Sequence, residues 1–381
     1  MVLEIALLHI SIMQLLKRSQ LLLWMLPLCA LSYCNKSDGN DGNGDSTPVE
    51  IKDSVIAQNL SHVWEMVWGP DDHIWFTERA GRISRLNPAT GTVTPLLTIA
   101  DVVANGEGGM LGLALHPNFS ATPHVYVVYN YNNGGSYREK VVRYNYASGT
   151  LSGATPIIEN IEAAGIHNGS RLLIVNDKLF ITTGDAANQS LPQNKNARNG
   201  KILRLNLDGS IPADNPVAGN PYWSFGHRNP QGLVYANGIL YSSEHGPNND
   251  DEVNIIEKGR NYGWPDVHGF CNSSGEDDFC HANQVVEPIK AWTPTVAACG
   301  LDYYNSDRIP QWKNSLLMVS LKNQRIYQMK LDASFKKIST TNEYLEGKYG
   351  RLRDMCISPQ GKVYIGSSNG GNDKIVEIDR K

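Results

Sequence analysis

Residues 67–77 read VWGPDDHIWFT, and residues 356–366 read CISPQGKVYIG. Each stretch places a tight turn rich in Gly, Pro, Asp or Ser between two apolar runs, which is typical of two strands joined by a hairpin. Weaker copies of the pattern lie between them, in residues 113–129, 173–181, 233–241 and 315–319. Six copies at intervals of roughly 40 to 60 residues correspond to the period of propeller blades.

Most copies close with a segment in which apolar and polar residues alternate, namely 82–87, 201–206, 325–331 and 374–378. Alternation with period two predicts half-buried strands, and no copy contains a long stretch with the helical period of 3.6. We therefore predict an all-β fold, a six-bladed β-propeller of four-stranded antiparallel blades. A pair of β-sandwiches is the alternative, and the internal repeat argues against it.

Two expectations concern the closure and the insertions of this fold. A strand near residues 50–56 is expected to pair into the last blade and close the ring. Residues 263–292 are expected to form surface loops on one face. With 381 residues, 41% of them hydrophobic, the chain is long enough for a large core, and its net charge of -4 lacks the basic excess of nucleic-acid-binding proteins.

The N-terminus has the features of an export signal. Lys17 and Arg18 precede an apolar run over residues 21–31, which is followed by Cys34. We predict a lipoprotein-type signal segment over residues 1–34, a flexible linker over 35–50 and the propeller domain over 51–381. A plain signal peptide or a single anchor helix is the alternative, although the run is shorter than the about 20 residues that span a bilayer.

This signal places the protein outside the cytoplasm. We expect a periplasmic or outer-membrane-attached lipoprotein that meets the membrane only through an N-terminal lipid anchor. In such an oxidising compartment Cys271 and Cys280 are expected to form a disulfide, and Cys299 with Cys356 is the expected second bridge. Buried free thiols are the alternative, and no cysteine spacing resembles a zinc site.

Four groups of polar residues suggest chemistry at the starts of the repeats. His167 precedes a strand, and its imidazole is suited to accept a proton near neutral pH. Arg228 and Asn229 suit an oxygen-rich anion. The carboxylate-rich residues 244–254 offer oxygen ligands for calcium. Lys322, Arg351 and Arg353 form the fourth group, which would bind an anionic ligand at the axis.

Each group also has a structural interpretation: a hydrogen-bonded core histidine, a surface arginine in a turn, a solvated acidic loop and a solvated strand face. Their recurrence at corresponding ends of the repeats favours one shared pocket, because these ends meet at the axis of a propeller. We therefore interpret the chain as an enzyme.

The motifs also carry a family resemblance. They are GGMLG at 108–112, GKILRLNLDG at 200–209, GHRNPQG at 226–232, EHGP at 244–247 and NYGWP at 261–265. In these segments the chain resembles the glucose/sorbosone dehydrogenase family, the soluble sugar dehydrogenases that depend on pyrroloquinoline quinone (PQQ). The resemblance spans nearly all of residues 55–380. It implies a six-bladed propeller that oxidises the anomeric hydroxyl of an aldose to a lactone by hydride transfer to PQQ.

The resemblance also implies roles for individual residues. His167 would be the general base, and Arg228 would act with it while Asn229 holds the cofactor. Lys322, Arg351 and Arg353 would neutralise the carboxylates of PQQ, and Trp292 would flank its ring. Two further residues, Glu107 and His245, stand at cofactor-facing positions where glucose-oxidising members have glutamine.

Two calcium ions (Ca2+) follow from the same resemblance. The carbonyls of Gly246 and Pro247 would bind one calcium at the cofactor, and Glu252 with the carbonyl of Tyr262 would bind a structural one. The expected partners are a small-molecule sugar and an electron acceptor of unknown identity, with a homodimer as one candidate assembly. The alternatives are a non-catalytic propeller that binds a glycan or a protein, and a calcium-dependent lactonase.

Overall fold

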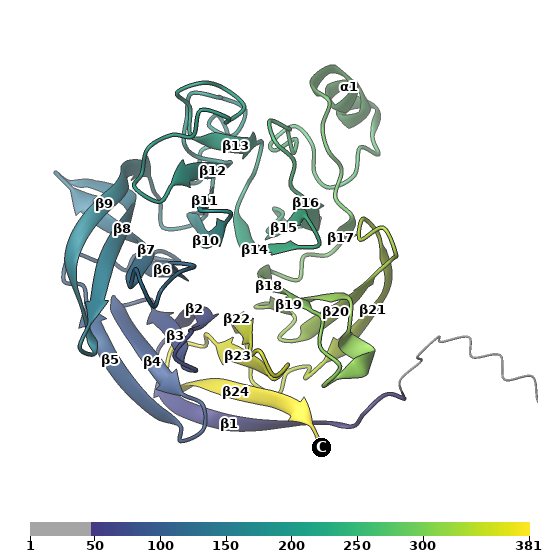
Figure 1. The fold of residues 1–381 in the computed structure, drawn as a ribbon. Coiled ribbons are helices and arrows are strands. Elements are labelled where there is room, and N and C mark those ends of the chain that lie inside the picture. Colours follow the sequence, from purple (N-terminus) through teal and green to yellow (C-terminus); the bar gives the residue numbers. More distant parts are fainter. Residues whose placement is uncertain (1–46) are drawn as a thin grey trace, which may run out of the picture. The chain divides into compact units, whose positions relative to one another are not determined.

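The computed structural model describes residues 47–381, which form six antiparallel sheets of four strands each around an axis (Figure 1). The predicted six-bladed β-propeller is confirmed. The predicted signal segment and most of the predicted linker lie outside the described residues. None of the helices within residues 47–381 is long and apolar enough to span a membrane.

Five of the blades are built from consecutive strands, with the innermost strand first. The first has β2 (Val63–Trp68), β3 (Ile74–Glu78), β4 (Arg82–Asn87) and β5 (Thr92–Thr98). The second has β6 (Met110–Leu115), β7 (His124–Asn133), β8 (Ser136–Ala147) and β9 (Thr150–Glu162). The third has β10 (Gly169–Val175), β11 (Lys178–Thr183), β12 (Lys201–Asn206) and β13 (Tyr222–Phe225).

The fourth and fifth blades are also built from consecutive strands, and the sixth takes its outermost strand from the start of the domain. The fourth has β14 (Pro230–Ala236), β15 (Ile239–Glu244), β16 (Asp251–Ile255) and β17 (Lys290–Trp292). The fifth has β18 (Ala298–Tyr304), β19 (Ser315–Ser320), β20 (Ile326–Leu331) and β21 (Ile338–Tyr344), with the 3-10 turn η1 (Pro310–Trp312) before β19. The sixth has β22 (Leu352–Ile357), β23 (Val363–Ser367), β24 (Asp373–Arg380) and β1 (Ile51–Leu60).

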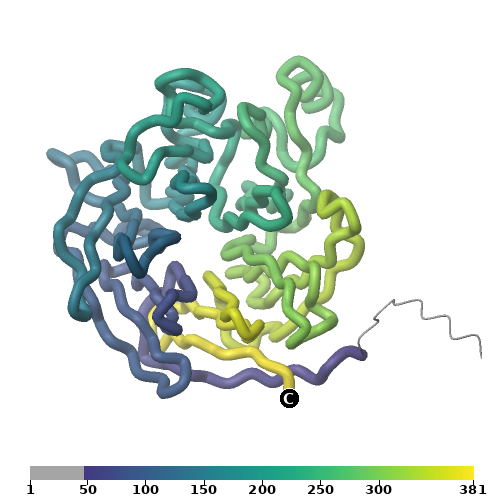
Figure 2. The backbone as a smooth tube through the Cα atoms, in the orientation of Figure 1, coloured from purple at the N-terminus to yellow at the C-terminus, as the bar shows by residue number. Residues whose placement is uncertain are grey.

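The sixth blade closes the ring, as expected from the sequence. β1 from the start of the domain pairs antiparallel with β24 from its end, in a register that sets Ile51 opposite Arg380 and Val55 opposite Val376. Figure 2 shows the two segments side by side, in purple and yellow. This pairing joins the first and last strands of the domain in one blade and so closes the ring.

Burial increases from the rim to the axis. All five residues of β3 and all six of β19 are buried, whereas in the outermost strands β5 and β21 every residue except Leu96 is exposed or partly buried. Neighbouring blades pack face to face through apolar side chains; one such cluster joins Tyr126 of β7 to Leu172 of β10. Burial of this kind stabilises by about 25 cal/mol per Å² of apolar surface.

A buried ionic group ties three innermost strands together at the axis. Arg171 of β10 lies 2.5 Å from Glu65 of β2 and 3.0 Å from Asp354 of β22, measured from its Nη1. All three residues are at most 5% exposed. Removal of one partner from such a group is costly because it leaves a buried charge uncompensated.

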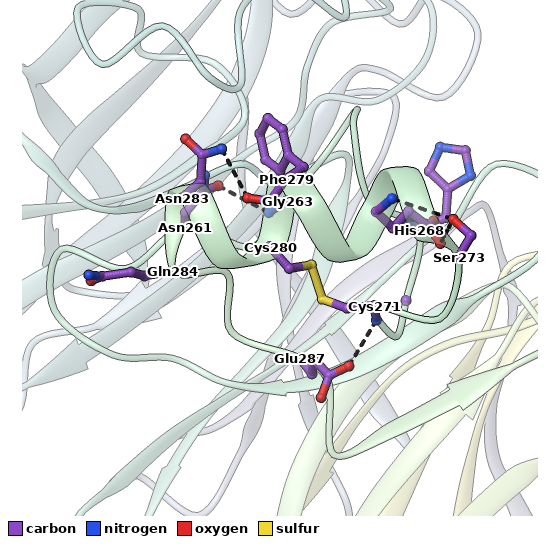
Figure 3. The surroundings of a disulfide bond; sticks show 12 residues. Asn261, Gly263, His268, Cys271, Ser273, Phe279, Cys280, Asn283, Gln284 and Glu287 are labelled. Carbon is purple, nitrogen blue, oxygen red and sulfur yellow. Dashed lines mark hydrogen bonds between the residues drawn. A yellow bond between two sulfur atoms is a disulfide. The ribbon is translucent and has the colours of Figure 1, made fainter.

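The insertion at residues 263–292 contains more structure than the loops that we expected. It includes the short helix α1 (Ser274–Asn283), which begins at the N-cap Ser273 and ends at Gln284 in the left-handed conformation. The predicted disulfide between Cys271 and Cys280 is present and ties the helix to the preceding loop (Figure 3). The helix buries only Cys280, so its sequence has no need of an apolar stripe. Without such a stripe the sequence did not predict a helix.

The predicted second disulfide is wrong. Cys299 and Cys356 are both free and buried. They lie on adjacent innermost strands but belong to different apolar clusters, Cys299 with Leu352 and Met355, and Cys356 with Val63. The two thiols therefore do not meet.

Candidate active site

His167 lies immediately before β10 and forms a hydrogen-bonded pair with a buried carboxylate. Its Nδ1 is 2.8 Å from Oδ1 of Asp185, which follows β11 and is 1% exposed. The His167 backbone is left-handed, with φ of 58°, and its side chain is 16% exposed. Because Nδ1 is engaged, Nε2 is the ring nitrogen available to a substrate.

The carboxylate of Asp185 is itself held from two sides. Its Oδ2 accepts a hydrogen bond of 2.9 Å from Nε1 of Trp264, and its Oδ1 accepts one of 2.8 Å from the amide of Ala187. A side chain at Gly184 would collide with the backbone, since a Cβ there would lie 1.9 Å from the carbonyl oxygen of His167. This close approach sets the histidine and the aspartate at a fixed separation.

Asp185 was not among the residues predicted from the sequence, although a signal for it was present. Gly169 pairs with Thr183 across the hairpin of β10 and β11. His167 precedes this pair by two residues and Asp185 follows it by two, so the hairpin register places the two side chains at the same end. The ring nitrogen that faces the carboxylate is thereby fixed.

Arg228 and Asn229 immediately precede β14, on the next blade. The carboxylate of Glu244 accepts the backbone N–H of both residues, with a distance of 3.2 Å to the amide of Asn229. The Arg228 guanidinium lies 5.3 Å from the ring centre of Trp264 and donates 3.2 Å to the carbonyl of His245. The side-chain carbonyl of Asn229 accepts 3.0 Å from the amide of Gly169, which links the two blades.

Glu244 belongs to a buried hydrogen-bonded chain. Its Oε2 lies 2.9 Å from Nδ1 of His227, and Nε2 of His227 lies 2.8 Å from Oγ of Ser224. Ser224 and His227 are fully buried. A substrate therefore cannot reach this triad, and its effect is to position the backbone of Arg228 and Asn229.

A third group of residues gathers around the side chain of Gln231 at the axis. Arg353 donates to its Oε1, and the thiol of Cys299 lies 3.5 Å from the same oxygen. Nε2 of His245 lies 3.7 Å from the Cys299 sulfur. Burial, followed by the charges of Arg353 and Arg228, lowers the pKa of His245 to about 3, so this imidazole is neutral.

The other two predicted cations lie at the protein surface. Lys322 is exposed and donates 3.0 Å to the hydroxyl of Thr295, and Arg351 is exposed just before β22. Glu107 is also exposed, with its Oε2 3.5 Å from the amide of His167. Arg79, which the sequence analysis did not select, is half-buried, and burial, with the charge of Arg353 next, lowers its pKa.

Trp292 pairs in the sheet with Asp251, whose carboxylate accepts the amide N–H of Gly246. Trp292 is the last residue of β17, the outermost strand of its blade, and its ring packs 5.5 Å from that of Tyr327 on the neighbouring blade. The sequence analysis expected it beside the cofactor ring. No hydrogen bond or ring contact joins it to His167, Arg228 or Arg353 within the described residues.

The four residues expected to bind calcium line one narrow polar cavity, together with Glu244, Asp250 and the carbonyl side of His245. Burial, and then the charge of Glu244, raises the pKa of Glu252 to about 8. Among residues 47–381, no three His, Cys, Asp or Glu side chains are grouped as metal ligands. Backbone carbonyls would therefore have to complete any calcium shell.

The site also has unpaired donors that suit a planar, polycarboxylate quinone. Nδ2 of Asn229, Nε of Arg228 and Nε of Arg353 are buried without a hydrogen-bond partner. A buried donor that lacks a partner is costly, and an anionic ligand would supply one. The residues present are therefore consistent with a bound PQQ.

Solved structures place this architecture among the quinoprotein sugar dehydrogenases. The PQQ-bound aldose sugar dehydrogenase of Streptomyces coelicolor superimposes with a TM-score of 0.75 at 30% identity, covering 88% of this chain and 99% of that one. The fold and the site define a sugar dehydrogenase of the quinoprotein class.

Sequence comparison identifies the family. The model of the Glucose / Sorbosone dehydrogenase family matches residues 60–376, and the chain belongs to this family. Quinoprotein glucose dehydrogenase B of Acinetobacter calcoaceticus is 32% identical, over 84% of this chain and 85% of that protein. Aldose sugar dehydrogenase YliI of Escherichia coli is 30% identical, over 84% of this chain and 91% of that protein.

Proposed function

We propose that the protein is a PQQ-dependent aldose dehydrogenase that oxidises the anomeric hydroxyl of a sugar to a lactone. The observation that carries the proposal is the pair of His167 and Asp185 beside the unpaired donors of Arg228, Asn229 and Arg353. A base and an anion-binding pocket at the same end of the axis are what this reaction requires.

In this mechanism PQQ, when bound, supplies the acceptor for the hydride from the anomeric carbon. Nε2 of His167 takes the proton of the anomeric hydroxyl as that hydride leaves. Asp185 stabilises the imidazolium that forms, through its hydrogen bond to Nδ1. Arg228 would orient the sugar, Asn229 would hold the cofactor, and Arg353 with Lys322 and Arg351 would bind its carboxylates.

Calcium is part of the same proposal. The carbonyls of Gly246 and Pro247 would hold one ion at the cofactor, and Glu252 with the carbonyl of Tyr262 would hold another. Support comes from the shared cavity and from the raised pKa of Glu252, which a cation would reverse. Oxygen ligands from carboxylates and carbonyls are those that calcium prefers.

Substrate specificity is proposed to be for aldoses in general rather than for glucose alone. Glu107 beside the base is a carboxylate where glucose-oxidising members have an amide. Export as a lipid-anchored protein, a soluble or membrane-bound electron acceptor and a homodimer also remain proposals for this chain.

The test is a titration of the purified, calcium-loaded protein with PQQ, followed by absorbance. We expect saturable binding and a spectrum that bleaches when an aldose is added. The variant His167→Ala should bind PQQ as the wild type does and fail to bleach. Saturable PQQ binding with no bleaching by any aldose would reject the proposed reaction, and turnover of a lactone without quinone would favour the lactonase alternative.

A further inference from the structure

A second pocket lies on the face opposite the active site. His167 and Arg228 sit before the starts of β10 and β14, whereas this pocket lies where both strands end. Since β10 has seven residues, at a rise of about 3.3 Å each, the two sites are roughly 20 Å apart. The pocket has a volume of 260 Å³ and is lined by Val175, Asn176, Lys178, Phe180, Arg204, Trp223, Tyr235, Gly238, Leu240 and Ile256.

Aromatic side chains form the apolar part of this pocket. Tyr235 is 42% exposed, the one exposed position in β14. The ring of Trp223 meets that of Phe180 edge to face, with 5.7 Å between centroids and an interplanar angle of 86°. The guanidinium of Arg204 lies 4.9 Å from the Trp223 ring and is itself held by Asp214. The indole is therefore fixed in place before any ligand arrives.

Polar donors complete the pocket. Asn176 comes from the turn between β10 and β11, Lys178 is the first residue of β11, and Gly238 comes from the turn between β14 and β15. Within residues 47–381, the side chains of Asn176 and Lys178 make no hydrogen bond or ion pair, so both are free to bind a ligand. None of these residues takes part in the proposed reaction at the active site.

We propose that this pocket binds one pyranose ring of an oligosaccharide or polysaccharide. A pyranose has an apolar C–H face and a polar rim of hydroxyls, which match an exposed tyrosine and a fixed indole beside an amide and an ammonium. The volume lies near the lower end of small-molecule sites, about 300–1,000 Å³, which suits one ring rather than several. The site would hold the enzyme on a sugar polymer while the active site, on the other face, stays open to free sugars.

Isothermal titration of the full protein without PQQ tests the site separately from the catalytic function. The probes are maltohexaose, which is neutral, and an oligogalacturonate, which is acidic. We expect at least one probe to bind with a millimolar dissociation constant, and Tyr235→Ala to weaken that binding about tenfold through the lost ring contact. Lys178→Gln should weaken the acidic probe alone. Phe270→Ala removes another exposed aromatic residue, 40% exposed in the insertion, and should leave binding unchanged.

Two results would overturn the proposal: neither probe binds in the millimolar range, or Tyr235→Ala binds as tightly as wild type. Tyr235→Phe distinguishes ring stacking from a hydroxyl hydrogen bond and should retain most of the affinity. The kcat for a monosaccharide should be the same in Tyr235→Ala as in wild type, because the pocket lies roughly 20 Å from the base by the strand length. If the wild-type protein binds a probe but shows no dehydrogenase activity when loaded with PQQ and calcium, the result counts against the catalytic proposal and not against this site.

Discussion

Asp185→Asn isolates the electrostatic support of the proposed base. Asparagine has nearly the same shape as aspartate but one acceptor oxygen instead of two, so it can accept from Ala187 at one position or from Trp264 at the other, but not from both. The substitution removes the negative charge beside His167, and with it the charge assistance of the hydrogen bond of 2.8 Å. A hydrogen bond to a charged group contributes about 1.5–3 kcal/mol, which corresponds to roughly 10- to 150-fold in rate.

The assay is the single-turnover reduction of bound PQQ by an aldose, with PQQ affinity measured in parallel. We expect the reduction rate to fall by about 10- to 150-fold while PQQ affinity changes little, because Asp185 contacts the base and not the cofactor residues. Asp177→Asn is the matched control: this residue is exposed in the turn at the other end of the same hairpin, and its variant should be unchanged. A rate for Asp185→Asn within twofold of wild type would refute the role of the pair.

Three further predictions concern the surroundings of the site. His227→Phe should keep a ring stacked on Tyr262, 4.6 Å away in the wild type, but it removes the hydrogen bond to Glu244. We expect the affinity for PQQ, measured by titration, to fall about tenfold, with a smaller effect on kcat. Burial raises the pKa of Glu139 from 4.5 to about 8, so its stabilising protonated form is present below pH 4.5 and lost as pH rises through 8. Glu139→Gln should therefore be more stable than wild type in thermal unfolding at pH 8.5, by at most about 5 kcal/mol, with the advantage gone near pH 4.5. Replacing Cys271 and Cys280 with serine should lower the local stability of the insertion by about 2–3 kcal/mol. The loss should appear as faster amide hydrogen exchange in α1 rather than throughout the ring.

The fold was predictable because its signals are local. Each hairpin repeats an alternation with period two and a turn, so six repeats identify the blades without long-range information. The pairing of Cys299 with Cys356 could not be judged in this way. It depends on where two adjacent strands point their side chains, and the two thiols belong to different clusters.

The site was predictable only in part, for a similar reason. The motifs identified His167 and Arg228, which precede innermost strands and so lie near the axis. Asp185 follows a second strand and reaches the site through the hairpin register. Trp292 ends an outermost strand and packs on Tyr327, and its expected place beside the cofactor stays a prediction. Residues that act through a partner are found by tracing strand pairing, not by reading motifs.

The most direct test of the catalytic account is a kinetic isotope effect on cofactor reduction. The calcium- and PQQ-loaded protein is mixed with an aldose carrying deuterium on the anomeric carbon, and bleaching is followed by stopped-flow absorbance. The account predicts bleaching that is slower with the deuterated sugar than with the protonated one, and absent in His167→Ala. Equal rates for the two sugars, or wild-type bleaching in His167→Ala, would contradict it.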